Sequence, residues 1–215
     1  MSQPAATSSQ RQGLQAGFPR LLGERLCLDF ANSVESPLTE PQEFLTGFGG
    51  LARWGRHVGL LDEAEVMALL GAARFRPGAA EALFADALRL RAAVQAVFAA
   101  IAAGAAPVAD ELAVIQQAYA QSLPRTRLTL REGRADWAWA ATGGLAAAEM
   151  VLWQVARSAV DLLTGDDLAR VKACDCCWLF YDTSRNGSRR WCSMEGCGTE
   201  AKMRRYTEKR RAARA

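Results

Sequence analysis

Residues 174–197 read CDCCWLFYDTSRNGSRRWCSMEGC and hold five of the six cysteines of the chain. Two closely spaced cysteines, a short hydrophobic segment and then Cys192 and Cys197 supply the number of thiolates that a structural zinc ion takes in closed tetrahedral coordination. The residues between them cannot bury enough apolar surface to fold alone, so the metal would replace a hydrophobic core. The spacing therefore predicts a small module that is folded around zinc.

The first pair of ligands can be chosen in two ways. Cys174 can act with Cys177, across a two-residue gap, or with Cys176, across a one-residue gap. The turn of a zinc knuckle favours the two-residue gap, because it lets both sulfurs and the backbone amides face one ion. We therefore predict Cys174, Cys177, Cys192 and Cys197 as zinc ligands, with Cys176 as the rival to Cys177.

The charge of the chain is divided unevenly along its 215 residues. Residues 170–215 carry 12 Lys and Arg against five acids, whereas residues 1–169 carry 14 against 18. A locally basic segment beside a mildly acidic body favours a polyanionic partner for the basic segment alone. The Ser- and Gln-rich residues 1–17 are expected to be disordered, 18–167 to form the main domain and 168–215 the zinc module with a basic C-terminal helix.

The sequence lacks two kinds of targeting signal. It has no run of about 18 apolar residues and no apolar core of signal-peptide type near its N-terminus. Clustered thiols at short spacings are typical of metal ligands kept reduced. We expect a cytoplasmic protein without membrane contact.

Apolar periodicity predicts a mostly helical main domain. The segment LCLDFANSV (26–34) is compatible with a strand or with the start of a buried helix, and periodicity does not decide between them. A hairpin is predicted around Gly133, where RLTLRE and DWAWAAT alternate. The mixed order of elements favours an α+β fold. Helices are predicted at 43–61 (with glycine breaks), 62–70, 79–104, 110–122 and 145–165.

Two stretches resemble known families. Residues 178–198, WLFYDTSRNGSRRWCSMEGCG, followed by AKMRR (201–205), resemble the C-terminal treble-clef finger of the bacterial CGNR zinc-finger family. LCLDFANSV with the later LARW (51–54) is similar to the opening of that family's N-terminal ABATE domain. The resemblance implies a stress-linked transcription regulator with a sensing domain and a DNA-binding finger. It also implies that the ligand lies two residues before Trp178, which is Cys176.

The chain departs from the family signature where the last helix begins. The signature Cys-Gly-Asn-Arg is Cys197, Gly198, Thr199 and Glu200 here. Thr199 and Glu200 suit a helix N-terminus as cap and first-turn acid. The change removes one phosphate contact and places a negative charge near a DNA backbone.

Cations that could contact DNA fall into two groups. Around the turn at Asn186 and Gly187, which fits a tight hairpin, lie Arg185, Arg189 and Arg190. The tail adds Lys202, Arg204, Arg205 and Lys209, with Arg210 and Arg211 beyond them. The alternative for each cation is a solvated charge or a partner for an acid of the main domain.

Polar and aromatic residues within apolar runs mark a candidate effector pocket, formed by Asp29, Asn32 and Trp54, although each also suits a buried core. No nucleophile elbow, phosphate loop or open metal site is visible, so an enzyme is not expected. The predicted function is a zinc-finger regulator that binds DNA, with a small-molecule or stress signal sensed by the main domain. The alternative is a zinc-stabilised module that binds protein or RNA. A two-fold operator would require a homodimer.

Overall fold

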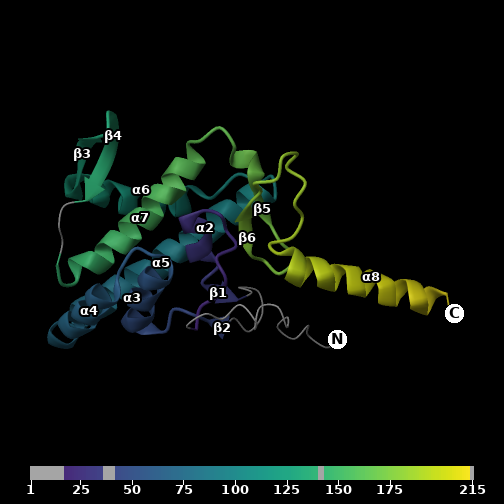
Figure 1. The fold of residues 1–215 in the computed structure, drawn as a ribbon, viewed down its shortest axis with the longest axis horizontal. Coiled ribbons are helices and arrows are strands. Elements are labelled where there is room, and N and C mark those ends of the chain that lie inside the picture. The colour runs from purple at the N-terminus through teal and green to yellow at the C-terminus, as the bar shows by residue number, and fades with distance from the viewer. Residues whose placement is uncertain (1–16, 36–41, 140–142, 214–215) are drawn as a thin grey trace.

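A computed structural model describes residues 17–35, 42–139 and 143–213 (Figure 1). Apart from Gly17, the predicted disorder of residues 1–17 lies outside the described residues. No helix in these ranges has the length and apolar character needed to cross a membrane. The α-helices are α2 (Leu26–Ala31), α3 (Gly47–His57), α4 (Glu63–Phe75), α5 (Pro77–Ala102), α6 (Ala109–Ser122), α7 (Ala146–Leu163) and α8 (Thr199–Ala212).

The strands form three separate two-stranded antiparallel pairs among the described residues. Helices therefore provide most of the fold, with small sheets between them, and the predicted α+β class is confirmed. The pairs are β1 (Val34–Glu35) with β2 (Gln42–Glu43), β3 (Thr126–Arg131) with β4 (Arg134–Trp139), and β5 (Val171–Ala173) with β6 (Leu179–Tyr181).

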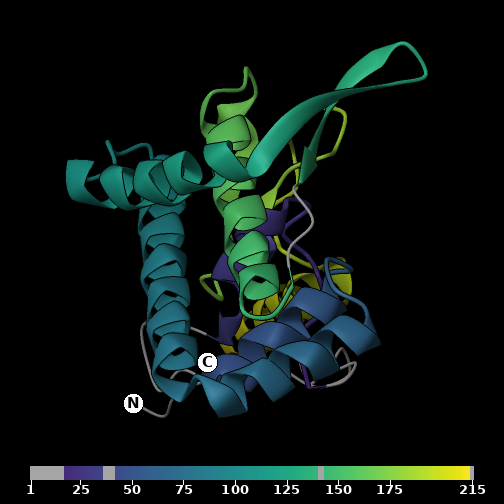
Figure 2. The same ribbon diagram turned by 90° about the vertical axis from the view of Figure 1, so that its left-hand side faces the viewer.

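Long helices build the main core. α5 begins with Pro77 in its first turn and carries an apolar face whose Leu90, Val94 and Val97 are buried. α4 begins with a capping box, in which the Asp62 side chain and the Glu65 side chain accept each other's backbone N–H groups. α6 crosses one end of α5 and α7 in Figure 2, and α3 with α4 lies at the other end. This arrangement leaves one side of α2 and α5 for the cysteine-rich module.

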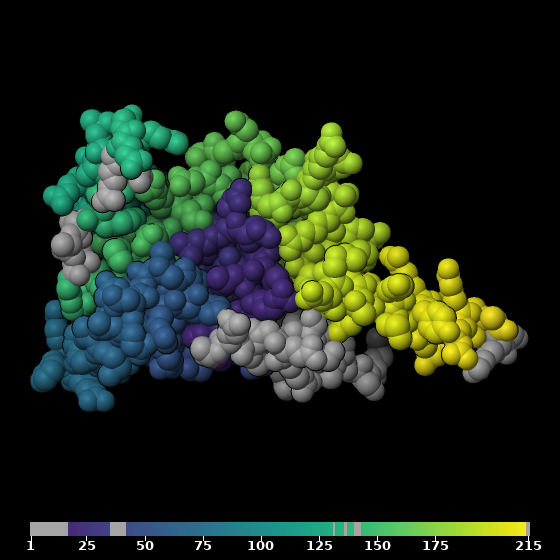
Figure 3. Space-filling view, in the orientation of Figure 1, coloured from purple at the N-terminus to yellow at the C-terminus, as the bar shows by residue number. Residues whose placement is uncertain are grey.

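The ambiguous segment 26–34 forms the short helix α2. Leu28 and Phe30 are fully buried there, and Cys27 is buried beside them, where burial raises the pKa of its thiol to about 12. A helix covered on several sides has no polar face, so its sequence shows no helical period. Figure 3 shows residues 17–34 between the main helices and the cysteine-rich module.

The glycines of α3 do not interrupt the helix, contrary to the predicted breaks. α3 runs without a gap from Gly47 to His57. A Cβ atom at Gly55 would lie 2.8 Å from Leu61 Cδ1 and 3.0 Å from Val151 Cγ2. The missing side chain allows α3 and α7 to pack closely, which offsets the lower helix propensity of glycine.

The predicted hairpin around Gly133 is present as β3 and β4. Leu128 pairs with Trp137, and Glu132 and Gly133 form the turn with positive φ angles. Trp139 stacks on Trp153 of α7 with ring centroids 6.2 Å apart. The hairpin is therefore anchored at its base, and its tip extends from the bundle in Figure 2.

Strand β6 contributes to two cores at once. Leu179 and Tyr181 belong to the main core, whereas Phe180, with Trp178, packs around the cysteines. Successive side chains of a strand point to opposite faces, so one strand of three residues serves both sides. The cysteine-rich module is thus packed onto the main domain through β6.

Candidate metal centre

Four cysteine sulfurs converge at the end of the β5–β6 pair. The Sγ atoms of Cys174, Cys176, Cys192 and Cys197 all lie within 4.8 Å of one another. Cys192 Sγ lies 3.6 Å from both Cys176 Sγ and Cys197 Sγ. Tetrahedral zinc with Zn–S bonds near 2.3 Å requires sulfurs about 3.8 Å apart. The spacing of the donors therefore fits a zinc ion held by four thiolates.

The local turn explains why Cys176 belongs to this group and Cys177 does not. Cys177 N donates to Cys174 O at 2.8 Å, and Cys174 N donates to Trp178 O at 2.9 Å. Cys177 has a φ of +69°, the left-handed conformation that follows such turns in hairpins. The predicted choice of Cys177 is thus corrected in favour of its rival Cys176, and the geometry supports Cys174, Cys176, Cys192 and Cys197 as ligands.

The second pair of cysteines is held by an irregular helical turn. η3 (Met194–Gly198) is a π-helical turn that begins after Ser193, whose side chain accepts from Gly196 N at 3.3 Å. Thr199 does not cap α8 as predicted, because its hydroxyl donates to Met194 O at 3.0 Å and Gly198 occupies the cap position. Glu200 lies in the first turn, as expected for an acid.

The electrostatics of the four closely spaced cysteines favour the binding of a cation between them. Hydrogen bonds from Cys176, Cys192 and Cys197 lower the pKa of Cys174, and the contact with Cys174 raises the pKa of Cys176 and of Cys192. Four thiolates at this distance repel one another, and a divalent ion compensates their charge. The group is closed by four sulfurs, which is typical of structural rather than catalytic zinc.

Family models match the two parts of the chain separately. The ABATE model, described as "Putative stress-induced transcription regulator", matches residues 24–166. The chain belongs to the ABATE family. The CGNR zinc finger model matches residues 170–210, which contain all four clustered cysteines. Neither model describes an enzyme, and no curated protein matches the chain. The family and the four-cysteine group together identify zinc as the cofactor.

Within the zinc finger, a buried carboxylate holds the loop between the two pairs of cysteines. Asp182 is fully buried and accepts from Lys172 Nζ at 2.6 Å, from Ser184 Oγ at 2.6 Å and from Arg189 N at 2.8 Å. Burial opposes ionisation, but these donors hold the pKa of Asp182 well below its usual range. Lys172 also donates to Gly187 O and Arg189 O. The predicted turn is present, since Gly187 N donates to Ser184 O at 3.1 Å, but no strands flank it, and the buried carboxylate instead of a hairpin ladder holds the loop.

The three loop arginines have different surroundings. Arg189 lies 4.6 Å over the Phe180 ring and donates to the carbonyl oxygens of Trp191 and Cys192. Its guanidinium also approaches Glu24 and the Leu22 carbonyl, both at 3.4 Å. These contacts of Arg189 hold the zinc finger against the ABATE region. They argue against the predicted contact of Arg189 with DNA. Arg185 and Arg190 are exposed.

The predicted tail cations all lie on α8. Ala201 is its only buried residue, and the helix leaves the body of the protein beyond η3 (Figure 1). Arg204 pairs with Asp175 at 3.5 Å, with both side chains exposed, and Arg210 lies 5.7 Å from the Tyr206 ring. In the described part of the chain, Lys202, Arg205 and Lys209 form no ion pair. Met203 and Tyr206, which sequence reasoning missed, are exposed beside them.

Two of the predicted pocket residues, Asn32 and Trp54, are structural. Asn32 is buried, donates from Nδ2 to Leu179 O at 2.8 Å and accepts from Leu179 N at 2.9 Å. It therefore pairs with β6 as a neighbouring strand would. Trp54 is buried edge-on to Phe30, with ring centroids 4.7 Å apart. Neither residue, nor Asp29, is among the residues that line the cavities beside Arg25 and beside Leu83, and the pocket role of the three stays a prediction.

Asp29 instead fixes the segment that leads into α2. Its Oδ1 accepts from Gly23 N at 2.8 Å, and a Cβ at Gly23 would lie 2.7 Å from Asp29 N. The carbonyl of Gly23 in turn accepts from Tyr181 N at 3.0 Å. Asp29 thus supports the contact between the ABATE region and the zinc finger from a partly buried position.

We expect Asp29→Asn to alter the pH dependence of stability. Burial raises the pKa of Asp29 to about 6, above its value in the unfolded chain. The folded state then binds the proton more tightly, so wild-type stability falls as pH rises from about 4 to about 6, by at most about 3 kcal/mol. Asparagine keeps the acceptor for Gly23 without the charge.

Denaturant titrations of wild type and Asp29→Asn from pH 4 to pH 8 measure this difference. The variant should gain stability relative to wild type as pH rises. A constant difference between the two proteins across this range would contradict the assignment.

Proposed function

We propose that the protein binds duplex DNA through the exposed face of α8. In this proposal the zinc finger holds α8 in place, and the ABATE region senses a signal. The proposal rests on one observation: α8 is a cationic helix in which only Ala201 is buried. Its 14 residues give a length of about 21 Å, enough to lie in a major groove about 12 Å wide.

The cations of α8 are arranged for phosphate contact. Lys202, Arg205 and Lys209 follow one another at spacings of three and four, which places them on one helical face. Their side chains are exposed and form no ion pair among the described residues. A row of uncompensated charges of this kind is typical of backbone contacts that position a protein on DNA without reading its sequence.

Met203 and Tyr206 favour a helix that meets a partner. Tyr206 follows Lys202 by four positions, so it borders the cationic face. The two side chains are 58% and 56% exposed, respectively, although both have substantial apolar surface. Apolar groups in a major groove can contact thymine methyl groups. The same pair would equally serve a protein partner, which is the second candidate.

The test is reversal of the cationic face. Lys202→Glu, Arg205→Glu and Lys209→Glu, combined in zinc-loaded full-length protein, should weaken binding to mixed-sequence duplex DNA about a hundredfold at low salt. The slope of log affinity against log salt should fall by roughly 2.7, because each lost phosphate contact accounts for about 0.9. Fluorescence anisotropy over a salt series measures both quantities.

A control with the same change in net charge separates a local site from a general charge effect. Arg53, Arg74 and Arg76 are exposed on and after helices α3 and α4, which lie on the other side of the molecule from α8 in Figure 1. Reversing these three to Glu should leave affinity and salt slope close to wild type. Equal losses in both triple variants, or none in either, would reject α8 as the DNA site and favour the protein-interaction candidate. Single-stranded RNA in the same assay tests the nucleic acid preferred.

A further inference from the structure

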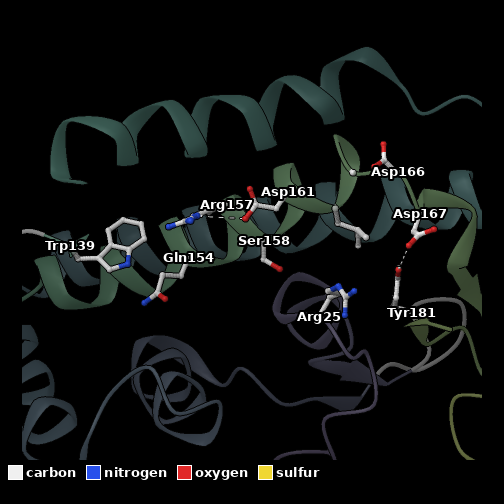
Figure 4. A pocket seen from close by; sticks show the side chains of 11 residues that line it. Arg25, Trp139, Gln154, Arg157, Ser158, Asp161, Asp166, Asp167 and Tyr181 are labelled. Atoms are coloured by element: carbon white, nitrogen blue, oxygen red, sulfur yellow. Dashed lines mark hydrogen bonds and ion pairs between the residues drawn. The ribbon is translucent and has the colours of Figure 1, made fainter. Parts of the chain in front are cut away.

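A cavity lies where the ABATE region meets the zinc finger. It has a volume of about 550 Å³ and is open to solvent. α7 forms one wall, Arg25 and the finger residue Tyr181 form the other, and Asp166 and Asp167 lie at one end (Figure 4). Neither the zinc ligands nor α8 contribute to it. Its volume falls within the range of small-molecule sites.

One part of the cavity offers donors for a carboxylate. The Arg25 guanidinium lies 3.8 Å over the Tyr181 ring, which fixes its plane. It donates from one nitrogen to Glu24 O at 2.7 Å, and most of its five N–H groups remain available. Ser158 Oγ accepts from Cys27 N at 3.2 Å and also hydrogen-bonds the Cys27 side chain, and Ser158 lines the cavity as a further polar group. In Figure 4, Ser158 points from α7 toward the side on which Arg25 lies.

The neighbouring turn of α7 offers acceptors for an ammonium group. Asp161 lies one turn beyond Ser158 and pairs with Arg157 only at 3.6 Å, with 64% of its side chain exposed. Asp166 has no ion pair or hydrogen bond among the described residues. Because these carboxylates and Arg25 line the same cavity, both charged groups of a zwitterionic ligand can be bound there.

The opposite end of the cavity is aromatic. Gln154, Ser158 and Asp161 share one face of α7, and the rise of seven positions from Gln154 to Asp161 is about 10 Å. Trp139 lies beyond Gln154 in Figure 4 and presents an indole held by stacking on Trp153. Gln154 has no hydrogen-bond partner in the described part of the chain. This end suits a flat apolar group that is separated from the charged end of the cavity by about the length of an aromatic side chain.

We propose that this cavity binds a free α-amino acid with an aromatic side chain. The carboxylate contacts Arg25 and Ser158, the ammonium group contacts Asp161, and the side chain lies along Gln154 against Trp139. The ligand touches α7 and, through Arg25 and Tyr181, the zinc finger. This regulatory role rests on the proposed function. As the signal, the amino acid would strengthen the contact between the zinc finger and the ABATE region and so change the position of α8.

Binding is tested without DNA. The common L-amino acids are screened against zinc-loaded full-length protein by thermal shift, and hits are measured by calorimetry. An aromatic amino acid should raise the melting temperature, whereas tryptamine, which lacks the carboxylate, and indole-3-propionate, which lacks the ammonium group, should bind at least tenfold more weakly. Absence of any shift at millimolar concentration, or equal binding of tryptophan, tryptamine and indole-3-propionate, would overturn the proposal.

Variants locate the site. Arg25→Gln and Asp161→Asn should each weaken the amino acid at least tenfold, while Arg74→Gln, an exposed change on α4, should have no effect. Because Arg25 also contacts Tyr181, zinc content is measured in each variant. Gln154, which has no hydrogen-bond partner among the described residues, provides a further variant, and Gln154→Ala should give an independent loss of affinity. Unchanged affinity in Asp161→Asn and Gln154→Ala would refute this site.

The regulatory part has its own outcome. The amino acid should change DNA affinity in wild type but not in Asp161→Asn. An amino acid that binds at this cavity but leaves DNA affinity unchanged would refute the regulatory coupling alone. Failure of the α8 reversals to affect DNA would refute the proposed function without altering the calorimetric result.

Discussion

Replacing Cys176 with serine will abolish stable zinc binding, whereas the same change at Cys177 will leave one equivalent of zinc per chain. Cys176 Sγ lies within the group of four sulfurs, and Cys177 lies outside it in a left-handed turn position. A structural zinc site contributes apparent free energies of about 10–16 kcal/mol at neutral pH, so loss of one thiolate unfolds the small module. η3 and α8 should lose their order, while α5 and α7 stay helical.

Zinc content after dialysis against a chelator, with far-UV circular dichroism, checks this result. Cys177→Ser is the matched control, since it removes one adjacent thiol and changes the same number of atoms. Cys192→Ser and Cys197→Ser should behave like Cys176→Ser. Retention of zinc by Cys176→Ser, together with its loss in Cys177→Ser, would restore the choice based on spacing alone.

Replacing Asp182 with alanine will destabilise the zinc finger by about 3–5 kcal/mol, the cost of breaking a buried ion pair by removing one partner. The change leaves the Lys172 ammonium without its carboxylate and the amide of Arg189 without its acceptor. Asp86→Ala is the control, because Asp86 pairs with Arg89 at the surface. That variant should change stability by less than about 1 kcal/mol.

The rate of zinc release to a chelator and the melting temperature measure the effect of Asp182→Ala. Faster release and a lower melting temperature are expected in this variant, with neither change in Asp86→Ala. Equal behaviour of the two variants would show that the loop is held by something other than Asp182.

Sequence patterns identified those features that depend on neighbouring residues. The Ala- and Leu-rich run 79–104 has a strong local preference and forms α5 with nearly the predicted ends. The zinc module was evident because four thiols at short spacings have few other uses. The choice between Cys176 and Cys177 was missed because it depends on a left-handed residue that is not glycine, a conformation without a sequence signal here.

Features that depend on distant residues were not accessible in the same way. Asn32 and Leu179 are 147 positions apart, so nothing near Asn32 indicates that it bonds to a strand instead of a ligand. The cavity was missed for the same reason, since Arg25 and Asp161 acquire their roles only when α2 and α7 are placed together. Helix α2 was undecided because its burial comes from elements far along the chain.

The strand shared by the two cores has an evolutionary consequence. Leu179 and Tyr181 of β6 complete the ABATE core, and Asn32 of the ABATE region supplies the hydrogen bonds of a missing neighbour strand to β6. A gene rearrangement that transferred this finger to another protein would leave a gap in the donor and an unpaired strand edge in the recipient. We expect the two parts to be inherited as a pair, with Asn32 constrained by its bonds to the main chain of residue 179 and Leu179 constrained by its own burial in the core.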